Sequence, residues 1–366
     1  MTSKRANWLF LTIILVHFGV VAFLIFGGEI LPDSLMLNFL LSQGILIVPT
    51  ILFLLIFGCG KRLAPQMRMS DGPQPVPGAP GQFEAAGFHR VKISTLLMII
   101  LCTFLIMPLV TVLNTLTMFF ADNAVAAMEG DIISTPFPAM LFMIGIFGPF
   151  CEEFVFRGVI YGSYRRSGGY EKGGCCQNTR NHGIAAVLLS AFLFGLMHMN
   201  FNQALYAFGI GIFLALLVEA AGSLWASVFC HMFFNSFQVV LMYVSGSILD
   251  SVYGQAVNEA AEQLTARELL AVLSVYLVIA AVTTPIAGCV VVWIAKNEGR
   301  QAAFGALFHR RDACMADQRP PQGMPQPQMD PSVQLMQQRT DYLLSVPLII
   351  AVVLCFGYMS LELFLA

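Results

Sequence analysis

The stretch CEEFVFRG, Cys151 to Gly158, places two adjacent glutamates and an arginine inside a run that otherwise has the composition of a membrane-spanning helix. An ionised side chain near the bilayer centre costs about 2.5–3.5 kcal/mol even on the lenient insertion scale, so it indicates a functional site by default. Glu153 and Arg157 are one helical turn apart and can pair on a shared face. Glu152 is rotated from Glu153 by about 100°. We therefore expect the two carboxylates to have different partners.

The composition of the whole chain is that of a polytopic membrane protein. Of its 366 residues, 57% are hydrophobic and 11% are charged, whereas a soluble domain has about 25% charged residues. The net charge of −2 gives no indication of a nucleic-acid partner. The 9 cysteines lie mostly inside apolar runs, without the spacing of a disulfide framework or a four-cysteine zinc site. The sequence thus predicts an all-α bundle of membrane helices with the lipid bilayer as its surroundings.

Nine apolar runs are predicted to span the membrane. They cover residues 7–26, 35–57, 94–120, 137–164, 184–199, 203–221, 223–245, 269–295 and 342–365. If the N-terminus is cytoplasmic, every one of the 19 lysines and arginines except Arg267 falls on the cytoplasmic side, as the positive-inside rule requires. We therefore expect an integral membrane protein, in the plasma membrane, with its N-terminus in the cytoplasm.

Three of these predicted spans carry polar side chains that their apolar surroundings should exclude. These side chains are Glu152, Glu153 and Arg157 on the fourth span, His198 on the fifth, and His231 and Asn235 on the seventh. Counted from the cytoplasmic side at about 1.5 Å per residue, the glutamates lie roughly 17 Å deep, His198 roughly 21 Å and His231 roughly 12 Å. These depths overlap, so the residues are predicted to form one site.

The residue types in this site suit peptide hydrolysis, and two alternatives stay open. A carboxylate beside an imidazole can take a proton from water and direct the hydroxide at a carbonyl, while a second imidazole and a carboxamide stabilise the oxyanion. Glu152, His198 and His231 could instead bind one Zn²⁺ with water as the fourth ligand. Buried ionisable residues also serve ion- or proton-coupled transporters, and a scaffold without proteolytic activity is a further possibility.

Three short motifs in this order resemble those of a known family. EEFVFR (Glu152 to Arg157), FGLMH (Phe194 to His198) and HMFFN (His231 to Asn235) are similar to the motifs of the CPBP intramembrane proteases. That family includes the type II CAAX prenyl endopeptidases and bacterial bacteriocin-processing homologues. The resemblance covers roughly residues 137–238, and each motif alone is weak.

The resemblance implies a role for each residue in the motifs. Glu152 would activate water together with His198, while His231 and Asn235 would form the oxyanion site. Glu153 and Arg157 would be a structural pair, and Phe194 would pack around the site. The implied enzyme is an intramembrane endopeptidase, dependent on glutamate or on metal. Its substrate would be a membrane-associated or lipidated protein or peptide.

The predicted organisation has three parts. Residues 1–93 would form an N-terminal transmembrane hairpin and a linker rich in proline and glycine. Residues 94–245 would be the catalytic membrane core. Residues 246–366 would supply the C-terminal helices, with a low-complexity cytoplasmic segment between them.

Overall fold

The computed structural model describes residues 1–26, 34–57, 87–167, 183–253, 265–308 and 343–365. Within these ranges the chain forms helices joined by turns, without a strand, which confirms the predicted all-α class. The long helices are α1 (Ser3–Phe26), α2 (Leu35–Phe57), α4 (Ile93–Thr117), α11 (Phe201–Ala221), α12 (Leu224–Tyr253), α13 (Ala266–Asn297) and α16 (Val346–Leu365). The short ones are α5 (Ala124–Ala127), α6 (Glu129–Ser134), α10 (Gly183–Leu196) and α14 (Gln301–Gly305).

One further span is continuous in space but changes its helical form along its length. It consists of α7 (Phe137–Met140), the π-helix η1 (Leu141–Phe147), α8 (Gly148–Glu153), the π-helix η2 (Phe154–Tyr161) and α9 (Gly162–Ser167). Together with the long helices it makes eight helices, within the described residues, that are long and apolar enough to cross a membrane.

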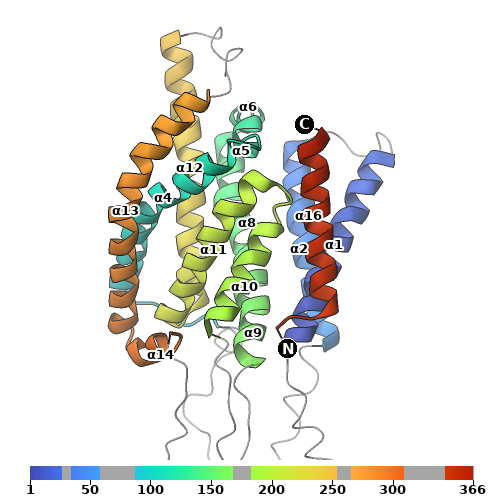
Figure 1. Ribbon diagram of the computed structural model, residues 1–366, viewed down its shortest axis with the longest axis vertical. Helices are drawn as coiled ribbons and strands as arrows, with labels where there is room; N and C mark the ends of the chain where they lie inside the picture. Colours follow the sequence, from blue (N-terminus) through green and yellow to red (C-terminus); the bar gives the residue numbers. More distant parts are fainter. Residues whose placement is uncertain (27–33, 58–86, 168–182, 254–264, 309–342, 366) are drawn as a thin grey trace, which may run out of the picture.

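The predicted span 184–199 differs from the other eight. It corresponds to α10, which has 14 residues and would extend about 21 Å at 1.5 Å per residue, less than the roughly 30 Å of a hydrocarbon core. The chain ends nevertheless lie at opposite ends of the bundle, at the start of α1 and the end of α16 (Figure 1). An odd number of crossings would produce this arrangement, and α10 as the ninth membrane span stays a prediction.

The helices form three groups that lie side by side (Figure 1). α1, α2 and α16 pack together on one flank, although α1 and α16 come from opposite ends of the sequence. α4, α12 and α13 occupy the other flank, where α13 packs along α4. α10, α11 and the segmented helix stand between them. The proposed division at residues 93 and 245 stays a prediction.

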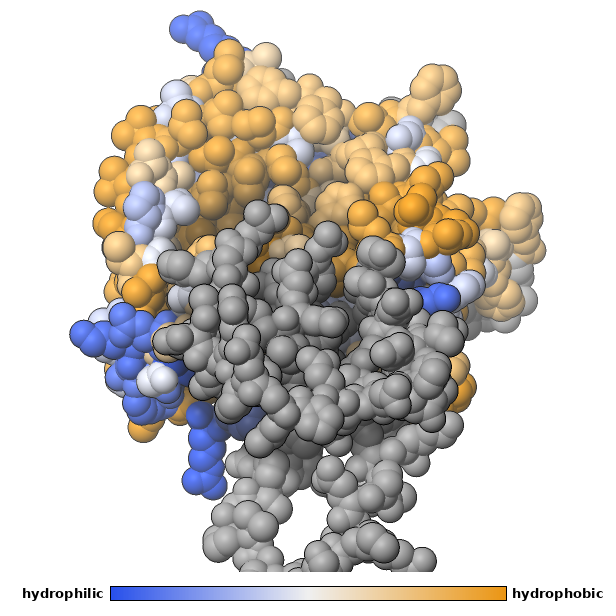
Figure 2. Space-filling model, turned by 60° about the horizontal axis from the view of Figure 1, so that its bottom comes forward, coloured by the Kyte–Doolittle hydropathy of each residue, from blue (hydrophilic) through white to orange (hydrophobic). Residues whose placement is uncertain are grey.

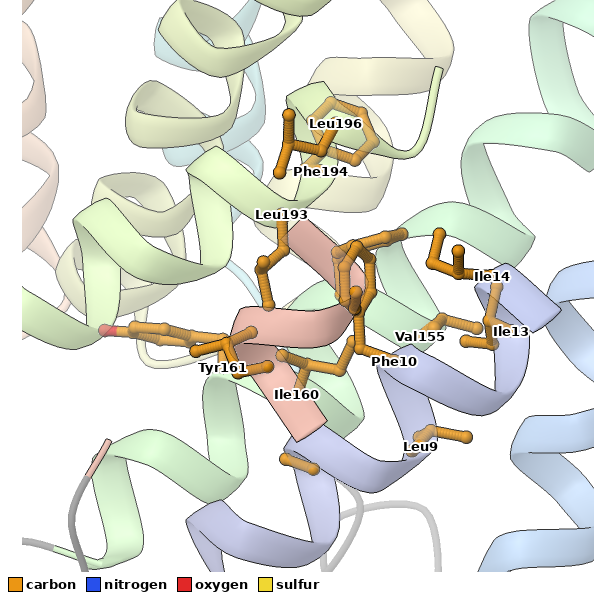
Figure 3. Close-up of a cluster of buried hydrophobic side chains, with 14 of the residues drawn as sticks. Leu9, Phe10, Ile13, Ile14, Val155, Ile160, Tyr161, Leu193, Phe194 and Leu196 are labelled. Carbon is orange, nitrogen blue, oxygen red and sulfur yellow. The ribbon is translucent and has the colours of Figure 1, made fainter. Parts of the chain in front are cut away.

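The flank that contains α1 is joined to the centre through a cluster of buried apolar side chains. Phe10 and Ile14 of α1 pack with Val155 and Ile160 of η2 (Figure 3). The ring of Phe10 meets that of Phe156 edge-on, with 6.4 Å between centroids. Between membrane helices such close packing, rather than exclusion of water, supplies the attraction. α1 therefore packs directly against the segmented helix that carries Glu152, Glu153 and Arg157.

The outside of the bundle is suited to lipid. Figure 2 shows a broad apolar surface, with hydrophilic residues gathered toward one end. Large apolar side chains are exposed along the helices, among them Leu55, Leu97, Val278 and Val353. Soluble monomers rarely expose such continuous apolar area. Together with the eight long apolar helices, this surface identifies an integral membrane protein.

Candidate functional site

The two adjacent glutamates end a single α-helical segment, α8, that lies between two π-helices. η1 precedes α8 and η2 follows it. π-helical turns are rare, carry one more residue per turn than α-helix, and are frequent at functional sites. Pro149 stands in the first turn of α8, where its missing N–H is tolerated. A π-helix therefore lies on each side of Glu152 and Glu153 along the chain.

Glu153 and Arg157 form a fully buried ion pair. Nη1 of Arg157 donates a hydrogen bond to Oε1 of Glu153 at 2.7 Å, and both side chains are 0% exposed. Nη2 of Arg157 donates to the backbone carbonyl of Gly211 on α11 at 3.2 Å. The guanidinium thus ties the segmented helix to α11. Removal of one partner would leave the other charge buried without compensation, which makes the pair sensitive to substitution.

Gly211 is required at this point because α10, α11 and the guanidinium approach one another closely. A Cβ added at Gly211 would lie 3.0 Å from Cα and Cβ of Ala191 on α10 and 3.2 Å from Nη2 of Arg157. Small residues at such crossings let membrane helices come into backbone contact. The position of the arginine therefore depends on two small residues outside the EEFVFR motif.

His231 lies between the two glutamates. Its Nδ1 is 3.0 Å from Oε1 of Glu153, and its Nε2 is 3.8 Å from Oε2 of Glu152. The His231 side chain is 6% exposed and that of Glu152 is 14% exposed. The two carboxylates therefore have different partners, as their spacing predicts. Glu153 is buried and accepts hydrogen bonds from both Arg157 and His231. Glu152 is partly exposed and hydrogen-bonds to neither Arg157 nor His231.

Phe194 of α10 is the aromatic centre of the site. The guanidinium carbon of Arg157 lies 4.2 Å from its ring centroid, a cation–π geometry. The rings of His198 and His231 meet it edge-on, with centroids at 5.1 Å and 5.8 Å. Phe156 contacts it at 5.3 Å. Phe194 therefore contacts residues of all three motifs and fixes the separation of the two histidines.

His198 does not lie within a helix, contrary to the predicted span 184–199. α10 ends at Leu196, and the chain turns through residues 197–200, with Met199 in the left-handed region at φ 54°. The reason is the N-cap of α11: the Asn200 side chain accepts hydrogen bonds from two backbone N–H groups at the start of that helix, which ends the preceding helix before Asn200. The boundary predicted at Met199 was therefore wrong.

The ring of His198 is oriented by its own turn. Nδ1 lies 2.9 Å from the backbone carbonyl oxygen of Phe194. A carbonyl only accepts, so Nδ1 carries the proton, and in the neutral ring Nε2 is left as an acceptor. Glu152 and His231 are both near enough to His198 to interact with it electrostatically. The half-buried imidazole thus has Nε2 as an acceptor and lies within electrostatic range of the partly exposed Glu152.

A polar clamp that the motifs do not reveal secures the turn that bears His198. Asn202, fully buried at the start of α11, donates through Nδ2 to Oδ1 of Asn114 and to Oγ1 of Thr117, both at 3.0 Å. Thr117 donates in turn to the Asn202 backbone carbonyl at 3.3 Å. These contacts join the end of α4 to the His198 turn. In the sequence, this clamp is indicated only by small polar residues at the ends of apolar helices.

Asn235 is held by the first π-helix. Its Nδ2 donates to the carbonyl oxygen of Ile144 at 3.2 Å, and the neighbouring Ser236 donates to the carbonyl oxygen of Gly145 at 3.2 Å. A Cβ at Gly145 would lie 2.5 Å from the Ser236 hydroxyl, so only glycine admits this contact. Asn235 therefore keeps one amide hydrogen beyond the one it gives to Ile144.

The residues predicted as possible zinc ligands are Glu152, His198 and His231. Across the described ranges, no three His, Cys, Asp or Glu side chains are placed so that they could hold a metal ion. In both histidines Nδ1 is engaged, by the Phe194 carbonyl in His198 and by Glu153 in His231. Metal-bound histidines commonly have one ring nitrogen engaged in this way, so Nε2 of each ring would be the nitrogen that meets a metal. Zinc binding stays a prediction, and no chemical step is assigned to a metal.

Comparisons with known proteins place the site inside a recognised family region. Residues 134–237 match the family model described as "Type II CAAX prenyl endopeptidase Rce1-like", which confirms the resemblance carried by the three motifs. All seven candidate residues and their motifs fall within that region, whereas α1, α2, α13 and α16 fall outside it.

Two curated relatives are similar over the same part of the chain. YdiL, a candidate membrane peptidase of Bacillus subtilis (strain 168), is 29% identical over 104 residues, which are 28% of this chain and 37% of the relative. The membrane-embedded CAAX protease MroQ of Staphylococcus aureus (strain USA300) is 30% identical over 125 residues, 34% of this chain and 48% of the relative. The chain thus spans less than half the length of either relative. No solved structure matches it significantly.

Proposed function

We propose that this chain is an intramembrane endopeptidase, on the premise that residues 134–237 match the Rce1-like family model. The observation that carries the proposal is the difference between the adjacent carboxylates. Glu153 is fully buried against Arg157 and His231, whereas the Glu152 side chain is 14% exposed and 3.8 Å from the nearer nitrogen of His231. One glutamate serves the structure, and its neighbour is placed to act on water.

In the proposed reaction Glu152 takes a proton from a water molecule while the water oxygen bonds to the carbon of the scissile carbonyl. Nε2 of His198, left unprotonated by the bond from Nδ1 to Phe194, accepts from the same water and orients it. The carbonyl oxygen becomes an oxyanion. When the carbon–nitrogen bond breaks, Glu152 returns the proton to the departing nitrogen, so water is divided between the two new chain ends.

The proposed oxyanion donors are on α12. Asn235 has one amide hydrogen left after its bond to Ile144, and His231 can donate when its Nε2 is protonated. Fixed donors of this kind stabilise an oxyanion by about 2.7–4 kcal/mol in hydrolases where one has been removed. The π-helix η1 contributes indirectly, because its carbonyl groups hold Asn235 in place.

The proposed substrate is a membrane-associated or lipidated protein or peptide. A membrane location follows from the eight apolar helices, and the CAAX description is that of the matched family model and of the relative MroQ. The proposed orientation has the N-terminus in the cytoplasm of the cell, at the plasma membrane, in keeping with the distribution of lysine and arginine.

A comparison of protein termini in whole membranes tests this function even while the substrate is unidentified. Cells would carry the native chain, Glu152→Gln, or the matched control Glu362→Gln, which makes the same change at an exposed position of α16. New termini should occur with the native chain and the control but not with Glu152→Gln. Identical termini in all three, at equal abundance of folded protein, would favour an ion- or proton-coupled transporter or a scaffold.

A further inference from the structure

Gln43 of α2 has a buried carboxamide that the site described above does not use. The residue is 8% exposed, and its Oε1 is buried with no hydrogen-bond partner among the described residues. Its Nε2 makes only a long contact, 3.4 Å, to the hydroxyl of the adjacent Ser42. An unsatisfied buried oxygen lowers stability relative to an apolar side chain. Its presence in an apolar helix therefore calls for a functional reason.

The carboxamide of Gln43 lies against the start of the helix that bears Glu152. A Cβ built at Gly148 would be 3.5 Å from Nε2 and 3.9 Å from Cδ of Gln43. Gly148 begins α8 and stands one turn before Glu152. Side chains of an α-helix lean toward its N-terminus, so the Glu152 carboxylate covers the turn that begins at Gly148. The carboxamide and the catalytic carboxylate thus share one face of α8.

The polar groups near Gly148 leave the Gln43 oxygen available. The backbone atom nearest the built Cβ is the carbonyl oxygen of Met143, at 3.1 Å. It is itself an acceptor and cannot donate to the Gln43 oxygen. The other buried atoms without partners near the site, Oε2 of Glu153 and Nε of Arg157, belong to side chains whose remaining atoms are strongly paired. Gln43 has no such strong contact among the described residues.

A peptide substrate in the membrane can supply the hydrogen-bond donor that Oε1 of Gln43 lacks. A peptide segment must leave helical conformation to expose its scissile bond, and each N–H it frees inside a bilayer needs a new acceptor. Main-chain contacts of this kind hold an extended peptide without requiring a particular side chain. The Gln43 carboxamide lies beside Gly148, one helical turn along α8 from the proposed catalytic base, and its oxygen is an acceptor of this kind.

We propose that Oε1 of Gln43 accepts a hydrogen bond from a backbone N–H of the extended substrate beside its scissile bond. The inference rests on the proposed endopeptidase function and adds a residue of α2, outside residues 134–237, to the substrate-binding site. The ligand it recognises is a peptide main chain, so the contact contributes affinity at many substrate sequences and does not select among them.

The test uses the purified full chain and a quenched fluorescent peptide built around a cleavage site found in the terminus comparison. Gln43→Met keeps an unbranched side chain and removes the acceptor. We expect kcat/KM to fall about tenfold, the effect of one hydrogen bond of about 1.4 kcal/mol. The unfolding temperature in detergent should stay equal or rise, because a buried unsatisfied oxygen has been removed. Gln301→Met, at an exposed position of α14, is the matched control.

A series of peptides with single backbone N-methyl groups identifies the donor. Methylation at one position should slow the native enzyme about tenfold yet have little further effect on Gln43→Met, because the two changes remove the same hydrogen bond. The proposal would be overturned if N-methylation slowed cleavage equally in both enzymes at every position. It would also be overturned if Gln43→Met cleaved at the native rate, or if its unfolding temperature fell together with its cleavage rate. Absence of cleavage by the purified native chain would instead reject the proposed function itself, and cleavage by Glu152→Gln at the native rate would reject the role proposed for Glu152.

Discussion

Two carboxylate–arginine clusters occur among the described residues, and they are built differently. Glu153 and Arg157 are 0% exposed, and each retains a buried polar atom without a partner among the described residues. Glu219 and Arg165, at the ends of α11 and α9, are 9% and 30% exposed. There Arg165 donates from Nε and Nη2 to the two carboxylate oxygens at 2.6 Å and 3.1 Å, and the Tyr161 hydroxyl adds a bond of 2.5 Å.

This difference separates a fully buried ion pair beside the candidate site from a partly exposed one that joins helix ends. The Glu219 cluster is completed by Arg300, whose Nε donates at 3.1 Å to the backbone carbonyl of Glu219. A Cβ at Gly222 would be 2.5 Å from the Arg300 side chain, and Gly222 has φ +68°, so this helix end accommodates only glycine. Glu153 instead shares its oxygen with His231. The Glu153 cluster therefore includes His231, a histidine with a role in the proposed reaction.

The largest predicted loss of stability comes from Glu153→Gln. The change leaves the Arg157 guanidinium fully buried without a counter-charge, and breaking a buried pair in this way costs about 3–5 kcal/mol. We expect the free energy of unfolding, measured in detergent with increasing denaturant, to fall by that amount, with loss of cleavage. Unchanged stability would show that the pair does not anchor the segmented helix.

The same substitution at the other cluster, Glu219→Gln, should have a much smaller effect. Water reaches Arg165, which is 30% exposed, so the loss of the pair should cost about 1 kcal/mol or less. The same unfolding measurement, with cleavage at the native rate, would agree with a structural role at the helix ends. A stability loss as large as that of Glu153→Gln would remove the distinction between the clusters.

A similarly small loss of stability is predicted for the clamp on the His198 turn. Asn114→Leu removes one acceptor of Asn202, which keeps its bond to Thr117, so the cost should be about 1 kcal/mol. Cleavage should slow because His198 is held less firmly. Thr111→Val is the matched control on α4, since Thr111 bonds only to the carbonyl of Met107 in its own helix. Equal rates for both variants would argue against the clamp.

The features that could be predicted from the sequence depend on local spacing. The one-turn separation of Glu153 and Arg157 predicts a shared face, and the long apolar runs predict the helices. The π-helices around α8 carry no comparable signal in the local spacing, and η1 in addition contacts the distant residues Asn235 and Ser236 of α12 through its carbonyl groups.

The end of α10 was predictable in part. Asn200 is a good N-cap residue, and its position before an apolar run gave a reason to end the preceding helix early. The clamp of Asn114 and Asn202 could not be found by spacing, because 88 positions separate its partners. Neither could the contact of α1 with η2, which joins the first helix to the segment that follows the two glutamates.

The measurement that tests the central claim most directly compares Glu152→Gln with the native chain for cleavage rate and for unfolding temperature in detergent. We predict a rate about 10²–10⁴-fold lower, the usual contribution of a general base, at an unchanged unfolding temperature, because Glu152 hydrogen-bonds to neither Arg157 nor His231. Native cleavage by Glu152→Gln, or unfolding as early as that of Glu153→Gln, would contradict the separate roles of the two glutamates.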